Sequence, residues 1–158
     1  MSLYRHDPIP FDESTRPMLP PIDDIIENFE LIEDWEHRYG YIIELGREMD
    51  ALPEAKQTEE NRVHGCESQV WLDVALDPAA PEPRLSLRGD SDSSIVRGFV
   101  ALMVSLYDGK SPQDAATTDG LDIFRRLDFG AHVTSKRSNG VRAMVARIQH
   151  DAKRFAAA

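Results

Sequence analysis

Residues 62–72 read Arg-Val-His-Gly-Cys-Glu-Ser-Gln-Val-Trp-Leu and contain the only cysteine of this 158-residue chain. From position 70 every second residue is apolar as far as Leu76. A period of two over that length predicts a half-buried β-strand. Gly65 stands just before Cys66 and permits backbone turns that residues with a Cβ resist. We therefore expect the thiol at the tip of a loop, beside the beginning of the strand.

The residues alone leave two interpretations of Cys66 open. Free cysteine is among the most buried residue types, so Cys66 can be a small apolar core residue. A thiol is a nucleophile only as a thiolate, which requires access and a cationic or hydrogen-bonding neighbour. His64 is the candidate neighbour, either as a proton acceptor or as an ordinary solvated loop histidine. On spacing alone, Cys66 is a candidate nucleophile and no more.

Four segments decide between these interpretations. They read Trp-Glu-x-x-Tyr-x-Tyr-Ile-Ile-Glu-Leu-Gly at 35–46, His-Gly-Cys-Glu-Ser-Gln-Val-Trp at 64–71, Gly-Asp-Ser-Asp and Ile-Val-Arg-Gly within 89–98, and Ser-Lys-Arg-Ser-Asn-Gly at 135–140. Their order and spacing resemble the SufE family, the sulfur-acceptor partners of cysteine desulfurases in iron–sulfur cluster assembly. The resemblance extends over roughly residues 22–155, and four ordered motifs around one cysteine are a specific signal.

This resemblance implies a function for the cysteine. Cys66 would attack the terminal sulfur of the persulfide on a cysteine desulfurase and carry it as Cys66-S-SH, stimulating the desulfurase and passing sulfur to a downstream iron–sulfur scaffold. The protein would be an accessory sulfur-transfer protein and not a stand-alone enzyme. The pyridoxal phosphate belongs to the desulfurase, so we expect no cofactor in this chain. One cysteine is also too few for a Cys-rich metal site, so we expect no metal.

The resemblance also suggests supporting residues. Arg137, a planar donor, could stabilise the thiolate or persulfide or fasten the loop through a carbonyl, or it could be an ordinary surface arginine. Asp92 is expected either to hold the loop in its resting position or simply to cap a helix. Gly65, Glu67 and Gln69 surround the thiol and are expected at the partner surface. Glu67 is acidic and would disfavour a thiolate, so it is assigned no catalytic role.

Charge is distributed unevenly along the chain. The formal net charge is −10, and residues 1–60 carry 16 Asp and Glu against 5 Lys and Arg. Nucleic acid is bound by neutralising phosphates with Lys and Arg, so this balance argues against a polynucleotide partner. The acidic residues either solvate helix faces or steer the protein toward a basic partner. We find no apolar run that could span a bilayer and no secretory signal, and expect a cytoplasmic location.

Periodicity predicts the elements around the cysteine loop. Residues 1–21 contain five prolines and are expected to be a poorly ordered extension, followed by a single domain over 22–158. Helices are expected from about residue 22, over 35–49, over 95–107, from 112, over 120–127 and after 140, with a hairpin partner strand at 84–88. Strands between helices indicate an α+β fold. The resemblance implies a small antiparallel sheet of about three strands with helices on one face, similar to IscU.

Two rival classes of function stay open on the sequence. A thiol enzyme that uses Cys66 with His64 would turn over without a protein partner. A partner-binding module in which Cys66 is incidental and the acidic first half docks would keep its activity as Cys66→Ser.

Overall fold

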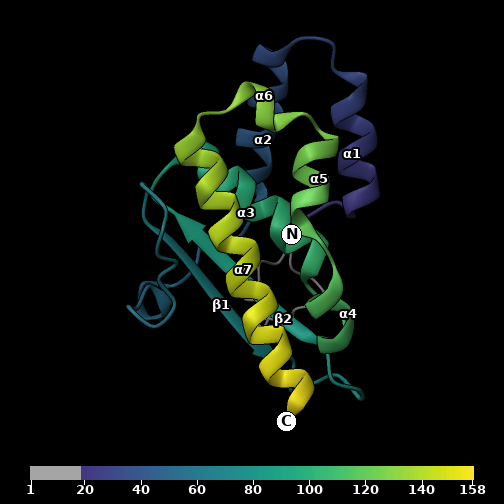
Figure 1. The fold of residues 1–158 in the computed structure, drawn as a ribbon, viewed down its shortest axis with the longest axis vertical. Helices are drawn as coiled ribbons and strands as arrows, with labels where there is room; N and C mark the ends of the chain where they lie inside the picture. The colour runs from purple at the N-terminus through teal and green to yellow at the C-terminus, as the bar shows by residue number, and fades with distance from the viewer. Residues whose placement is uncertain (1–18) are drawn as a thin grey trace, which may run out of the picture.

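The computed structural model describes residues 19–158, and Figure 1 shows two strands packed among helices. The strands are β1 (Val70–Leu76) and β2 (Leu85–Ser91), and a short 3₁₀ turn occupies Glu54–Lys56. The helices are, in chain order, α1 (Ile22–Leu31), α2 (Trp35–Glu48), α3 (Ser94–Tyr107), α4 (Pro112–Thr117), α5 (Gly120–Arg126), α6 (Phe129–His132) and α7 (Ser135–Ala157). This arrangement confirms the predicted α+β class. Most of the predicted N-terminal extension lies outside the described residues.

The predicted helix starts are confirmed where a capping side chain marks them. Asp34 caps α2 by accepting a hydrogen bond from the backbone N–H of His37. Ser111 caps α4 in the same way, with Pro112 in the first turn, where the missing N–H costs nothing. Helix α3 is buried nearly all round, as its continuous apolar sequence predicts.

The sheet is a two-stranded antiparallel hairpin among the described residues, and about three strands were expected. The register runs from Val70 opposite Ser91 to Leu76 opposite Leu85. On the other edge of β1, the segment before Cys66 makes only an isolated bridge, Arg62 opposite Trp71. That segment stays short because the chain turns away at Gly65, whose φ is +96°.

Two boundaries differ from the sequence prediction. Strand β2 continues through Gly89 and Asp90 to Ser91, although these residues were expected to end it. The reason is packing, because a Cβ at Gly89 would lie 2.7 Å from Cγ1 of Val100 in α3. Helix α7 begins at Ser135, and was expected to begin only after Gly140.

The start of α7 has a local cause. Thr134 accepts a hydrogen bond from the backbone N–H of Arg137 and so starts the helix six residues earlier than expected. Asn139 and Gly140 suggested a turn, but they belong to the second turn of the helix. Residues 135–140 are therefore the first turns of α7 and not a loop.

The core places α3 between the sheet and α2, while α7 packs along α3, α4 and β1 (Figure 1). A buried ionic contact fastens the end of β2 to the end of α2. Arg97 donates to Asp90 at 2.5 Å and to the carbonyl oxygens of Gly46 and Met49, each at 2.6 Å. The other oxygen of Asp90 accepts from the Leu52 N–H at 2.9 Å. This network orients the chain that leads toward the cysteine loop.

No helix in the described part of the chain combines the length and the apolar character that a membrane crossing requires.

Candidate functional site

The loop that carries the cysteine is tied down at both ends. At its beginning, the Val63 N–H donates to the Val70 carbonyl at 2.8 Å. At its end, the Gln69 N–H donates to Oδ1 of Asp92 at 3.0 Å, and the Asp92 N–H donates back to the Gln69 carbonyl at 3.3 Å. Gly65, at φ +96°, supplies the left-handed turn between these anchors. The residues from Gly65 to Ser68 are thus the part of the loop that lacks a strand partner.

Helix α7 holds the segment that precedes the loop. The guanidinium of Arg147 donates to the carbonyl oxygens of Glu60, at 2.8 Å, and Arg62, at 3.3 Å. The same guanidinium pairs with the buried carboxylate of Asp151 at 2.8 Å, which fixes its direction. Because one helix contacts both this segment and the thiol, the position of the loop relative to α7 is well defined.

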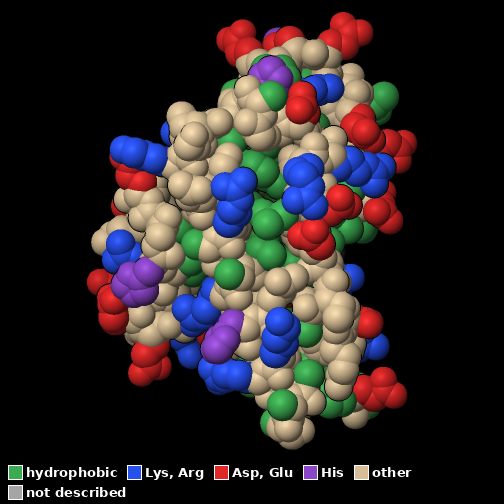
Figure 2. Space-filling view, viewed as in Figure 1, with side chains coloured by type: hydrophobic (Ala, Val, Ile, Leu, Met, Phe, Trp, Pro, Cys, Tyr) green, Lys and Arg blue, Asp and Glu red, His purple; other side chains and the backbone are tan. Residues whose placement is uncertain are grey.

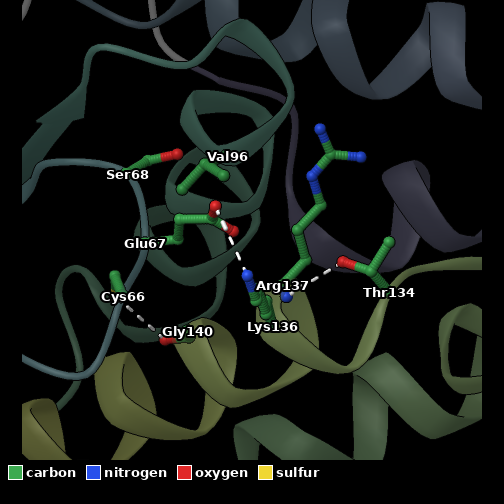
Figure 3. A pocket seen from close by; sticks show the side chains of 8 residues that line it. All are labelled: Cys66, Glu67, Ser68, Val96, Thr134, Lys136, Arg137 and Gly140. Atoms are coloured by element: carbon green, nitrogen blue, oxygen red, sulfur yellow. Dashed lines mark hydrogen bonds and ion pairs between the residues drawn. The ribbon is translucent and has the colours of Figure 1, made fainter.

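Cys66 rests half-buried against the second turn of α7. Its thiol donates a weak hydrogen bond to the Gly140 carbonyl, with Sγ and O 3.6 Å apart (Figure 3). A Cβ at position 140 would lie 3.4 Å from that Sγ. The thiol therefore sits directly over position 140, where a side chain larger than a methyl group would compete for its space.

Two opposing effects act on the acidity of this thiol. Burial raises the pKa of Cys66 above the ordinary value, because the thiolate loses hydration, while the nearby charge of Arg62 acts in the opposite direction. Burial is the larger effect, so the resting thiol is protonated at neutral pH and is a weak nucleophile. Nε of Arg62 is itself buried without a hydrogen-bond partner.

A hollow of about 430 Å³ opens beside the thiol. Its walls come from the loop, from the first turn of α3 and from the start of α7, and are formed by Cys66, Glu67, Ser68, Val96, Thr134, Lys136, Arg137 and Gly140. Figure 3 shows the ammonium of Lys136 reaching across to the carboxylate of Glu67, where Nζ and Oε1 are 3.7 Å apart. The guanidinium of Arg137 points away from the thiol in this view.

Charge is also segregated over the whole molecule. Figure 2 shows acidic side chains over the end formed by α1 and the start of α2, while Lys and Arg follow the length of α7. The hollow therefore lies at the start of a basic helix within a chain of net charge −10.

The structure brings some of the predicted site residues together and separates others. Cys66, Glu67 and Arg137 line the same hollow, whereas Gln69 contacts Asp92 at the end of the loop. Asp92 holds the loop and is not the cap of α3, because Ser93 accepts from the Val96 N–H.

The ring of His64 is paired with a carboxylate, while the thiol of Cys66 donates to Gly140. The exposed His64 ring has Nε2 3.0 Å from Oε1 of Glu59, on the connector that precedes the loop. The placement removes the geometric basis for a Cys66–His64 pair in this conformation, since a general base must lie within hydrogen-bond reach of the proton it takes.

Four neighbours of the loop were not predicted as site residues: Arg62, Lys136, Gly140 and Arg147. Lys136 stands beside Arg137 in the sequence, and two adjacent cations before an apolar helix were the available signal. The sequence pattern predicts a turn at Gly140. Arg62 and Arg147 carry no local signal, because their roles arise from contacts between distant segments.

Within residues 19–158, no group of three or more His, Cys, Asp and Glu side chains is arranged to hold a metal ion. The chemistry that the arrangement supports is that of one thiol. It is sheltered at rest, it shares a hollow with Lys136 and Arg137, and it is carried by a loop whose central residues have few backbone contacts.

Comparisons with known proteins show the family of this chain. A model of the SufE family, described as an Fe-S metabolism associated domain, matches residues 23–152. An uncharacterized SufE-like protein of Rhizobium etli is 44% identical over 143 residues, covering 90% of this chain and 97% of that protein. Another uncharacterized SufE-like protein, of Rhizobium meliloti, is 42% identical over 132 residues, covering 84% of this chain and 94% of its own length.

The fold has a counterpart among solved structures. The solution structure of a hypothetical protein from Thermus thermophilus superimposes with a TM-score of 0.70, at 18% identity, over 89% of this chain and 99% of that one. At that identity the likeness concerns the fold alone. The family match and the two close relatives cover nearly the whole described chain, and they show that this chain belongs to the SufE family, whose domain is associated with Fe–S metabolism.

Proposed function

We propose that this SufE-family protein accepts persulfide sulfur from a cysteine desulfurase on Cys66, stimulates that enzyme and passes the sulfur to an iron–sulfur scaffold in the cytoplasm. The observation that carries the proposal is the placement of the thiol. The only cysteine of the chain sits at the centre of a loop anchored at both ends, half-buried in a hollow beside Lys136 and Arg137.

The transfer is an exchange of one S–S bond for another. The Cys66 thiolate attacks the outer sulfur of the desulfurase persulfide, the S–S bond of that persulfide breaks, and the desulfurase cysteine leaves as a thiolate. Cys66 becomes Cys66-S-SH, and the proton that its thiol gave up returns to the leaving thiolate. Sulfur oxidation states balance between donor and acceptor, so no external oxidant or reductant enters the step.

The resting geometry suits a carrier better than a free-standing catalyst. The buried, protonated thiol is protected from oxidation, because oxidation proceeds through the thiolate and requires access. The same burial keeps it from reacting until the loop moves out of its seat against Gly140. A docked desulfurase that draws the loop outward would therefore both expose the thiol and restore its acidity.

Other residues have supporting roles in this proposal. Asp92 holds the end of the loop at rest, and Gly65 gives it the turn about which it moves. Lys136 and Arg137, at the positive end of the α7 dipole, favour an anionic thiolate or persulfide once the loop is released. Glu67 and Gln69 flank the thiol on the surface that a partner would approach.

The pyridoxal phosphate that forms the donor persulfide belongs to the desulfurase in this proposal. This chain contributes the acceptor thiol, the half-buried position that protects it and the charged side chains that line the hollow. A thiol enzyme that depends on His64 is less well supported, because the His64 ring pairs with Glu59 on the exposed connector.

Desulfurase turnover tests the proposal. A desulfurase from the same organism, supplied with cysteine and a reductant, should release alanine faster when the wild-type protein is added. Cys66→Ser should remove the stimulation, while a substitution on the distant end of α7, Lys153→Gln, should retain it. Equal stimulation by wild type and Cys66→Ser would favour the partner-binding module, with the cysteine incidental.

A further inference from the structure

The start of α7 carries charges that oppose its dipole. The N-terminal end of a helix is positive, so acidic residues are favoured there and cations are not. The first turn of α7 contains no acidic residue and contains Lys136 and Arg137. Sequences that break such a local rule do so most often where function requires it. These two cations line the hollow beside Cys66.

One acidic residue compensates Lys136, and it comes from the loop. Glu67, which follows Cys66 directly, places Oε1 3.7 Å from Nζ of Lys136 (Figure 3). This ion pair joins the part of the loop that has no strand partner to the helix against which the thiol rests. Together with the weak hydrogen bond from Cys66 to Gly140, it connects the centre of the loop to α7.

The pair is accessible to solvent and to a partner. The side chains of Lys136 and Glu67 are 73% and 69% exposed. An ion pair at this exposure is weak and screened by salt, so it can hold a loop in place without locking it. A charged group of a partner can therefore pair with either Glu67 or Lys136 and break the contact between them.

We infer that Glu67 and Lys136 form an ionic latch that holds the Cys66 loop in its resting seat, and that a cationic partner surface opens it by taking Glu67. This inference rests on the proposed function, since it names how the partner gains access to the thiol. The feature that a cationic group of the partner would recognise is the exposed carboxylate of Glu67 itself. Once Glu67 is engaged elsewhere, the ammonium of Lys136 is uncovered beside the released thiol. Glu67 and Lys136 are thus positioning residues, which act on the reaction through Cys66.

Labelling of Cys66 by iodoacetamide, a neutral reagent, tests the latch in the isolated protein. The latch predicts that Glu67→Gln and Lys136→Gln both speed labelling, each by about 1.5- to 5-fold, the range expected for an exposed ion pair. The double variant should label no faster than the faster single variant, because both substitutions remove the same contact. Raising the salt concentration should speed labelling of the wild type and leave the double variant nearly unchanged.

The signs distinguish a latch from a simple effect of charge on the thiol. If the two side chains only tuned thiol acidity, Glu67→Gln would lower the pKa of Cys66 and speed labelling, whereas Lys136→Gln would raise the pKa and slow it. The pH profile gives the same distinction: release of the loop lowers the midpoint in both variants, because burial is what raises the pKa of Cys66, whereas a charge effect moves the midpoint in opposite directions in the two variants. The swapped variant, Glu67→Lys with Lys136→Glu, should restore a labelling rate and a midpoint close to those of the wild type.

Two matched variants control for net charge. Glu27→Gln, at an exposed position of α1, and Lys153→Gln, at an exposed position near the end of α7, make the same charge changes away from the hollow and should label at the wild-type rate. Opposite signs for the Glu67 and Lys136 variants, additive effects in the double variant, or equal acceleration by the controls would each overturn the latch.

Failure of the latch and failure of the proposed function give different results. Labelling needs no desulfurase, so it reports on the latch alone. If wild-type Cys66 accepts sulfur but neither substitution changes the labelling rate, the latch is refuted and the carrier function is supported. Faster labelling of both variants, with no sulfur ever found on Cys66, would support the latch and refute the carrier function.

Discussion

Substitution of Gly140 tests directly whether the thiol of Cys66 rests against the second turn of α7. A Cβ at this position would lie 3.4 Å from Sγ of Cys66, an ordinary van der Waals distance. Gly140→Ala should therefore leave the thiol in place. It should also stabilise α7 by up to about 1 kcal/mol, the difference in helix propensity between glycine and alanine.

Gly140→Val adds two methyl groups about 1.5 Å beyond that Cβ, the length of a carbon–carbon bond. They would occupy the space of the sulfur, and Cys66 would have to leave. The seat stabilises the closed loop mainly by burying half of a small side chain, about 1 kcal/mol by area. Losing it raises the exposed population about fivefold. The pKa of Cys66 should also fall toward its ordinary value, because burial is what raises it.

Iodoacetamide labelling, followed by mass spectrometry across a pH series, measures both effects. The valine variant should label about fivefold faster than the alanine variant at neutral pH, with its midpoint at lower pH. Urea unfolding of both variants checks that each is folded. Equal labelling rates for wild type, alanine and valine variants would show that Cys66 does not rest against Gly140.

Three further results are expected. Arg97→Met should lower the free energy of unfolding by about 3–5 kcal/mol in urea titration, because it leaves the buried carboxylate of Asp90 without its cation. A loss below about 1 kcal/mol would contradict the buried network. Asp92→Ala should speed hydrogen exchange of the Gln69 amide severalfold, since that amide loses its acceptor, whereas unchanged exchange would place the loop anchor elsewhere. The raised pKa of Cys66 means that the folded state binds the thiol proton more tightly than the unfolded state does. The free energy of unfolding should therefore fall as pH rises above the ordinary thiol pKa of about 8.5, and Cys66→Ser should remove this part of the decline. Identical pH dependence in the two proteins would contradict the burial of the thiol.

The helices and the hairpin could be predicted because their signals are local. Asp34 and Ser111 mark helix starts through hydrogen bonds three residues away, and apolar spacing predicts which faces are buried. The errors occurred at glycines. Gly89 and Gly140 suggested ends of elements, yet each lies inside one. At Gly89 the close approach of Val100 excludes a Cβ, and at Gly140 the Cys66 thiol lies in van der Waals contact with the place a Cβ would take. A single sequence does not distinguish these two reasons for a glycine.

The reactive residue of the site could be predicted from the sequence, but most of the contacts around it could not. Cys66, its loop and the neighbouring Arg137 follow from the motifs. The pairing of Glu67 with Lys136 joins residues 69 positions apart in the chain, and no local pattern indicates it. The same holds for the hydrogen bonds of Arg147 to the connector before the loop. His64 was favoured by proximity in sequence, but its ring pairs with Glu59 on the connector before the loop.

Intact-mass spectrometry after incubation with a cognate desulfurase and cysteine tests the central claim most directly. The account predicts that the wild-type protein gains the mass of one or more sulfur atoms, that a reductant removes the gain, and that Cys66→Ser acquires none. Peptide mapping should place the added sulfur on Cys66. An unchanged mass, with a desulfurase shown to be active in the same tube, would contradict the assignment of Cys66 as the sulfur acceptor.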